Sequence, residues 1–319
     1  MVSPVKMFLE GGGFQFPVLA LGMFAMLFAL IIPLAIGFAK WRVPASLALL
    51  GPVGVVATGL LGTLFGMQQA WQAHAVASAE VKDTLLAAGA SVALYTLLFA
   101  TVMMIAAAVL ACFAAAIPAV AAVGPEPRVD VRGLLAAAGG AMGAFVVAVI
   151  LCVSVVGLGE LAELGLALPV GLLICALVTL LTIVACGRIA SEDPLHQGRI
   201  AGSRFFIAMC GALALILLGE FLRSAGQSNA ARALAVASAE VKAMMVYQSQ
   251  QGASNGAWLG WLLALVPMTA GTCGALHWVK RIDGRGGVGA VISLVSIVLI
   301  LVMMYAARSA SVHQVAGLW

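Results

Sequence analysis

The sequence predicts an all-α, polytopic integral membrane protein with about eight transmembrane helices in two parallel four-helix repeats. Composition is the first reason: 64% of the residues are hydrophobic and 9% are charged, whereas a soluble domain carries about 25% charged residues. The second reason is that the uncharged stretches 14–39, 87–123 and 165–187 meet the roughly 20 residues that a helix needs to cross a bilayer. The third reason is an octapeptide that occurs twice, which predicts the duplication.

The spans follow from the apolar runs between polar connectors. Helices are expected because lipid leaves no partner for unpaired backbone groups, and the alternating ten-residue segments typical of a membrane barrel do not occur in the sequence. The first run is too long for the apolar region of a signal peptide, so we expect it to be retained as a span. The eight spans are expected near residues 14–38, 45–66, 86–122, 133–158, 165–187, 205–222, 256–277 and 287–306.

The basic residues predict how the spans are oriented. Four connectors, at 40–42, 128–132, 188–204 and 277–285, hold ten of the 16 Lys and Arg residues. Basic residues concentrate in cytoplasmic loops. We therefore expect these connectors in the cytoplasm and both termini on the other side.

The octapeptide AVASAEVK occurs at 75–82 and again at 235–242, 160 residues further along. Its copies fall between the second and third spans and between the sixth and seventh spans, so an even number of spans separates them. The halves 1–160 and 161–319 are therefore predicted to be parallel repeats, unlike the inverted repeats of many transporters.

The charged residues of the octapeptide are candidates for partner docking. On a helix, residues two apart do not face each other, so the carboxylate and the ammonium of one copy would not pair together. The segment is either a short helix with a solvated charged face or a docking surface, and its small alanines favour close approach by a neighbour. The candidate docking residues are Glu80, Lys82, Glu240 and Lys242.

Glu220 is placed at the end of the sixth span, near the outer interface. A carboxylate within hydrocarbon is costly and by default suggests a function. Arg223 lies three residues on, within reach on a helix, so an interfacial anchor is the alternative to partner docking.

Glycines in the second and fourth spans predict close helix packing, because they let two backbones approach. Thr63 follows one of these glycines, and its hydroxyl either bonds its own helix or points into a pore. The packing glycines are Gly59, Gly62, Gly66, Gly139, Gly140 and Gly143.

Enzymatic chemistry has no support in the sequence. It contains no catalytic triad pattern or phosphate loop, and its four His residues do not cluster as metal ligands do. The six cysteines fall within apolar runs without CxxC spacing, so we expect buried thiols and no disulfide framework or zinc site. The few, scattered basic residues also do not suggest nucleic acid. We expect no cofactor and no metal.

The first half resembles the MotA/TolQ/ExbB proton channel family. The resemblance rests on FLEGGGFQFPVLALGMFAMLFAL at the N-terminus, GLLGTLFGMQQAWQA in the second span and AAGASVALYTLLFATV in the third. It implies that Thr63 lines an ion pathway, with Thr96 one position from the second family threonine. It also implies a bacterial inner membrane and a single-span TolR/ExbD-like partner. The large cytoplasmic domain of the family is missing, since the first connector is only 40–44, and the degenerate second half has Arg223 where the first has Thr63.

Three functions remain open from the sequence. The first is a stator-like subunit of an ion channel complex driven by the proton motive force. The second is a non-conducting scaffold or assembly subunit that uses the same fold within a homo- or hetero-oligomer in the membrane lipids. The third, a small-solute transporter, is less favoured because no span centre shows a broken helix with convergent polar groups.

Overall fold

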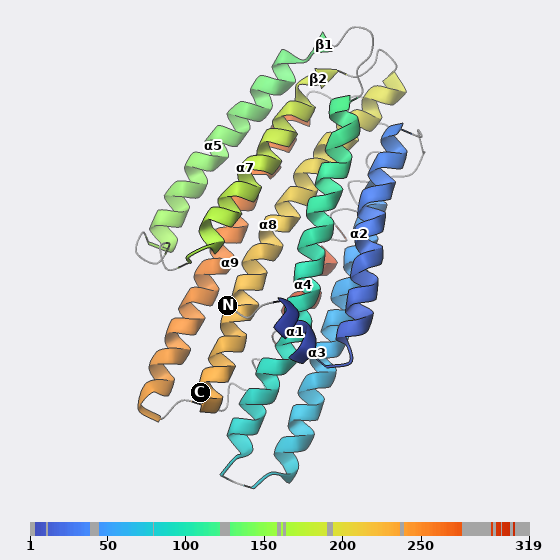
Figure 1. The fold of residues 1–319 in the computed structure, drawn as a ribbon. Helices are drawn as coiled ribbons and strands as arrows, with labels where there is room; N and C mark the ends of the chain where they lie inside the picture. The colour runs from blue at the N-terminus through green and yellow to red at the C-terminus, as the bar shows by residue number, and fades with distance from the viewer. Residues whose placement is uncertain are drawn as a thin grey trace.

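The structure, a computed structural model, describes residues 4–10, 12–38, 45–78, 80–121, 128–157, 161, 164–189, 194–236 and 239–275, and a few residues between 295 and 309. Apart from two short strands, the elements in these ranges are helical (Figure 1). In chain order they are α1 (Pro4–Glu10), α2 (Gln15–Phe38), the 3-10 helix η1 (Ala45–Leu49), α3 (Leu50–Val76), α4 (Lys82–Ala121), β1 (Arg128–Val129), α5 (Val131–Val155), α7 (Ala167–Cys186), β2 (Arg188–Ile189), α8 (Pro194–Val236) and α9 (Ala239–Ala275).

Among the described residues, seven helices are long and apolar enough to cross a membrane: α2, α3, α4, α5, α7, α8 and α9. The protein is therefore a multi-pass membrane protein. The eighth expected span, 287–306, falls largely outside the described residues, although Ile300 and Met304 are buried within the main apolar cluster.

Two helical hairpins form the centre of the fold. The first hairpin consists of α3 and α4, the second hairpin consists of α8 and α9, and α4 packs along α8 to join them. The apolar part of α8 is 78% buried, against 17% for α5. The joined hairpins are thus the protein's own core, whereas α5 presents most of its surface outward.

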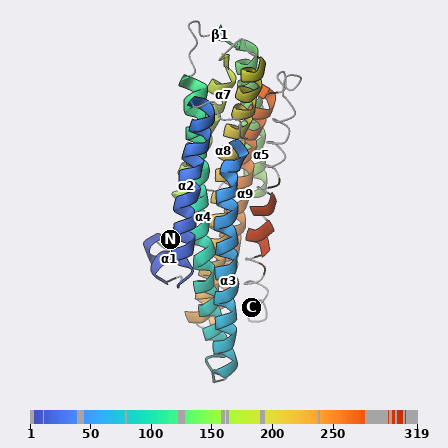
Figure 2. The ribbon, with the colours of Figure 1, turned by 90° about the vertical axis from the view of Figure 1, so that its right-hand side faces the viewer.

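The remaining helices flank these hairpins on opposite sides. Helices α1 and α2 pack on the first hairpin, and α5 and α7 pack on α9 in the second (Figures 1 and 2). The contact of α1 includes Phe8, whose ring lies 5.3 Å from the Phe16 ring and 5.5 Å from the Phe99 ring. Buried Gln15 fixes the turn between α1 and α2, because its Nε2 donates to the Met7 carbonyl at 3.2 Å.

A two-strand ladder closes the end of the fold opposite the hairpin turns. Strands β1 and β2 pair antiparallel, with Arg128 opposite Ile189. The next residue, Asp130, donates its backbone N–H to the Gly187 carbonyl and accepts from the Gly133 N–H at 3.0 Å. Asp130 therefore caps the start of α5 and ties it to the end of α7.

The hairpins extend well beyond the helices that flank them, as Figure 1 shows at its lower edge. The apolar span that includes α3 runs over 30 residues, Leu47–Val76, which is about 45 Å of helix against roughly 30 Å of hydrocarbon. Both octapeptide turns lie at this extended end. Val76 ends α3 before the first turn, and Val236 ends α8 before the second.

The expected ends of the sixth and seventh spans are wrong. The sequence predicts the sixth at 205–222 and the seventh at 256–277, but α8 continues to Val236 and α9 begins at Ala239. Glu220 therefore lies inside α8 rather than at its end. The reason is that polar residues such as Ser224 and Ser228 are buried between helices, where they have protein neighbours instead of water.

Candidate functional site: the contacts within and between the hairpins

Small residues bring α3 and α4 together along the first hairpin. A Cβ added at Gly59 would lie 2.7 Å from the Ala100 Cβ, and one added at Gly66 would lie 2.9 Å from the Ala93 Cβ. Such separations are shorter than carbon–carbon contact, so the helix axes approach as closely as glycine permits. The predicted packing role of Gly59 and Gly66 agrees with this geometry.

The same contacts recur 160 residues further along, in the second hairpin. A Cβ at Gly219 would lie 2.9 Å from the Gly260 Cα, and one at Gly226 would lie 2.6 Å from the Ala253 Cβ. The four positions are those of Gly59, Ala100, Gly66 and Ala93, shifted by the octapeptide spacing. The two hairpins therefore share their helix-to-helix register.

One contact keeps its place but exchanges its residue sizes. In the first hairpin, a Cβ at Gly62 would lie 2.5 Å from Thr96 Cγ2; in the second, the glycine is Gly256, whose added Cβ would lie 2.6 Å from the Leu222 Cβ. Leu222 corresponds to Gly62 and Gly256 corresponds to Thr96. Each hairpin thus has one small and one larger residue at this level, on opposite helices.

Polar side chains join the two hairpins at α4 and α8. The Ser228 hydroxyl donates to the Ser91 carbonyl at 3.1 Å, and the two hydroxyl oxygens are also 3.1 Å apart. The Arg232 guanidinium donates to the Tyr95 hydroxyl at 3.4 Å. Sequence reasoning missed these four residues, although each pair on one helix is spaced by four and so shares a face.

The two threonines predicted for an ion pathway are both buried inside the first hairpin. Thr63 is fully buried, and its hydroxyl donates to the Gly59 carbonyl of its own helix at 2.9 Å. Thr96 is 1% exposed and lies against Gly62. Of the two interpretations left open for Thr63, the bond to its own helix is the one the structure contains.

Glu220 is buried between the helices of the second hairpin. It is 6% exposed, and its Oε1 accepts from Trp261 Nε1 of α9 at 3.3 Å. The contact is internal to the chain rather than presented to a partner. The indole and the carboxylate thus add a polar contact to the packing of α8 on α9.

The octapeptide residues lie at the turns of the two hairpins. Glu80 is exposed in the first turn and Lys82 begins α4 with its side chain half-buried. In the second copy, the side chains of Glu240 and Lys242 lie outside the described residues. The turn of the first hairpin is therefore open to solvent or to a neighbour.

The glycines of α5 divide into two groups. Gly140 packs on α9, where an added Cβ would lie 2.8 Å from the Cys273 Sγ. A Cβ added at Gly139 or Gly143 would meet nothing within 4 Å. No helix in the described part of the chain packs on these last two glycines, which lie on the outward side of α5, so their expected packing role stays a prediction.

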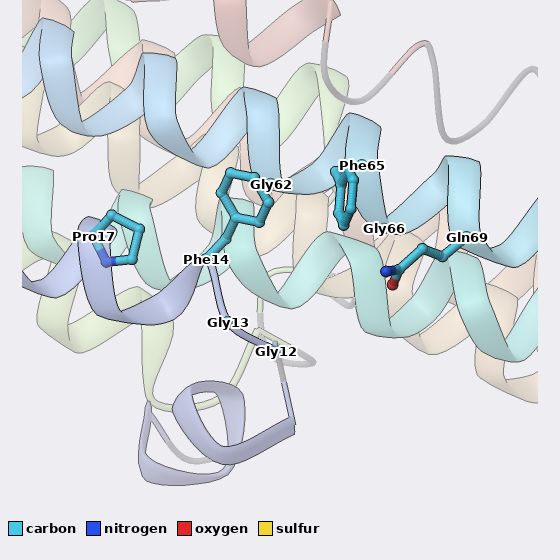
Figure 3. A pocket seen from close by; sticks show the side chains of 8 residues that line it. All are labelled: Gly12, Gly13, Phe14, Pro17, Gly62, Phe65, Gly66 and Gln69. Carbon is cyan, nitrogen blue, oxygen red and sulfur yellow. The ribbon is translucent and has the colours of Figure 1, made fainter.

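A hollow beside the first hairpin is lined in part by the glycines of α3. It has a volume of about 290 Å³ and lies between the turn that precedes α2 and the C-terminal half of α3 (Figure 3). The rings of Phe14 and Phe65 approach each other there at 5.5 Å. The lining residues are Gly12, Gly13, Phe14, Pro17, Gly62, Phe65, Gly66 and Gln69.

Metal-binding geometry is not found in the described part of the chain, where no three His, Cys, Asp or Glu residues form a group that could hold an ion. The six cysteines are free thiols, five of them buried. Comparison with known proteins adds no assignment, because no family model, no curated protein and no solved structure matches the chain.

Proposed function

We propose that the chain is a tandem duplication of one four-helix unit, and that it acts as a non-conducting scaffold subunit of a larger membrane complex. The duplication is supported by contacts that recur at the octapeptide spacing. Gly59 meets Ala100 as Gly219 meets Gly260, and Gly62 meets Thr96 where Leu222 meets Gly256. Chance similarity between two apolar hairpins would not reproduce the register of all these contacts.

The scaffold role rests chiefly on one observation: the Thr63 hydroxyl is fully buried and satisfied by Gly59 of its own helix. A pore-lining hydroxyl has to face water. The polar groups that join different parts of the chain, Ser91 with Ser228 and Tyr95 with Arg232, hold the hairpins side by side. These contacts suit a rigid framework.

A stator-like, proton-conducting subunit with a single-span partner is the second candidate. It is favoured by the hollow that Gly62 lines. Gly62 precedes Thr63 in the sequence and lies against Thr96. Entry of water or of a partner helix there would bring a polar path close to both hydroxyls. This candidate keeps the bacterial inner membrane, and the positive-inside rule supports a cytoplasmic position for the β1–β2 end.

Two matched variants test the scaffold proposal by the mass of the intact complex, purified from its native membrane in mild detergent. Ser228→Leu places a bulky side chain against α4 and should reduce the yield of intact complex. Thr63→Val keeps the side-chain shape and should leave the mass and composition unchanged. The scaffold proposal is refuted if the wild-type chain purifies without any other protein or second copy.

A further inference from the structure

The interface between the hairpins uses one stripe on each helix. On α4 the stripe includes Leu98, Ala108 and Cys112, and on α8 it includes Cys210 and Leu217; these residues are at most 1% exposed and belong to one apolar cluster. Ser91 and Ser228 close the polar end of the interface. The interface thus joins two different surfaces, the stripe on α4 (the α4 face) and the stripe on α8 (the α8 face).

If the halves are repeats, each of these faces has a counterpart 160 residues away. The counterpart of the α4 face lies on α9, and the counterpart of the α8 face lies on α3. In the described part of the chain, α3 and α9 do not pack extensively on each other. The internal contact therefore joins the two units head to tail and leaves one face of each kind at the two ends.

Both counterpart faces are exposed. On α9, Trp258 stands at the position of Leu98 and is 47% exposed, against 1% for Leu98. On α3, Leu64 stands at the position of Ser224 and is 40% exposed, against 1% for Ser224. Other exposed residues at counterpart positions are Leu50, Leu61, Gln68 and Gln72 on α3, and Ser254, Trp261, Leu265, Met268 and Thr272 on α9.

We propose that the α3 face of one copy of this chain docks on the α9 face of a second copy, in the register of the internal α4–α8 contact. The inference rests on the proposed duplication. A second copy is the expected occupant because the proposed contact continues an interface that the chain already forms within itself. Repeating a head-to-tail contact closes a ring when the rotation allows it.

The internal register specifies which residues meet across the copies. Within one chain, Ser91 lies opposite Ser228; across the copies, the corresponding residues are Gln251 and Gln68, so that two amides take the place of two hydroxyls. The two indoles of α9 then lie beside the leucines of α3, with Trp258 at the level of Leu61. Further along the same face, a Cβ added at Gly54 would meet nothing within 4 Å, whereas its counterpart Ala214 is fully buried. The α3 face thus has room for a large side chain.

Lipid is the competing occupant of these faces. Tryptophans are common where helices leave the hydrocarbon, and exposed leucines are ordinary in lipid. Gln68 lies toward the extended end of α3, where the interface supplies water, so its exposure alone does not distinguish lipid from protein. The register does favour a protein neighbour, because Gln251 of α9 stands at the matching level and each face is apolar next to it.

Disulfide crosslinking in native membranes tests the proposal, on a background in which the six native cysteines are replaced. Leu61→Cys with Trp258→Cys should give disulfide-linked dimers and larger species after mild oxidation. The matched control, Leu61→Cys with Met268→Cys, moves the second cysteine about 15 Å along α9, beyond the roughly 7 Å that a disulfide can bridge between Cα atoms. It should give several-fold less dimer.

Ser91→Cys with Ser228→Cys is the internal control and should close within one chain. If that control closes while the Leu61/Trp258 pair gives no more dimer than the Leu61/Met268 pair, the exposed faces meet lipid; the inference then fails and the scaffold proposal stands. If the internal control does not close either, the α4–α8 register is wrong and both proposals fall.

Discussion

Exchanging the sizes at one packing level tests the duplication at atomic scale. In the first hairpin, a Cβ at position 62 would lie 2.5 Å from Thr96 Cγ2 and 2.9 Å from the Phe14 Cβ. Gly62→Leu therefore overpacks the contact, and we expect it to lower the free energy of unfolding by about 1–3 kcal/mol. Thr96→Gly removes the obstructing methyl group and lowers stability by a smaller amount through helix propensity and a small void.

The double variant Gly62→Leu with Thr96→Gly reproduces the pair that the second hairpin already uses, Leu222 with Gly256. We expect it to be more stable than the sum of the single changes predicts, by at least about 1 kcal/mol, since contacting residues couple by roughly 0.5–3 kcal/mol. Recovery should be partial, because Phe14 still lies against position 62.

Reversible unfolding in mixed detergent micelles, followed by circular dichroism, gives the four free energies of this cycle. Single and double variants must be compared at one detergent composition. Additivity within about 0.5 kcal/mol would show that the sizes at positions 62 and 96 are independent, and the equivalence of the two hairpins would then lose its strongest support.

Replacing glycine by alanine should change the free energy of unfolding in opposite directions at two other positions. Gly219→Ala places a Cβ 3.0 Å or less from backbone atoms of α9 and should lower the free energy of unfolding by about 1–3 kcal/mol. The Cβ of Gly139→Ala meets nothing within 4 Å, so this variant should raise the free energy of unfolding by up to about 1 kcal/mol through helix propensity. Equal effects of the two substitutions would mean that α8 and α9 are not in close contact. Single cysteines at Ser78 and Ser238 should both react with an impermeant maleimide applied from the non-cytoplasmic side. Labelling of only one of them would contradict parallel halves.

The sequence predicted the outward-facing helices better than the enclosed ones. Helices α2 and α7 begin and end within two residues of the expected spans, because a helix surrounded by lipid is apolar on every side and hydropathy alone marks its ends. The sequence underestimates the length of α8, because polar residues such as Ser224 and Ser228 are typical of the end of a span, and only the structure shows that they are buried.

The candidate site was predicted less well, because a residue's type does not tell which way its side chain faces. Thr63 and the glycines on either side of it were correctly placed on one helix. The orientation of α3 toward α4 then buries the hydroxyl of Thr63 and packs Gly59 and Gly66 on the neighbouring helix. The contact between Ser91 and Ser228 joins residues 137 positions apart, and no local pattern indicates such a pairing.

Proton flux into liposomes that contain the purified native complex tests the scaffold claim most directly. With a potassium gradient and valinomycin to set the membrane potential, a pH-sensitive dye inside the vesicles should report the same rate for wild type, for Thr63→Val and for the matched Thr269→Val on α9. The reason is that the Thr63 hydroxyl is buried and bonded to Gly59. A wild-type flux that Thr63→Val abolishes and Thr269→Val preserves would contradict the account and establish the conducting alternative.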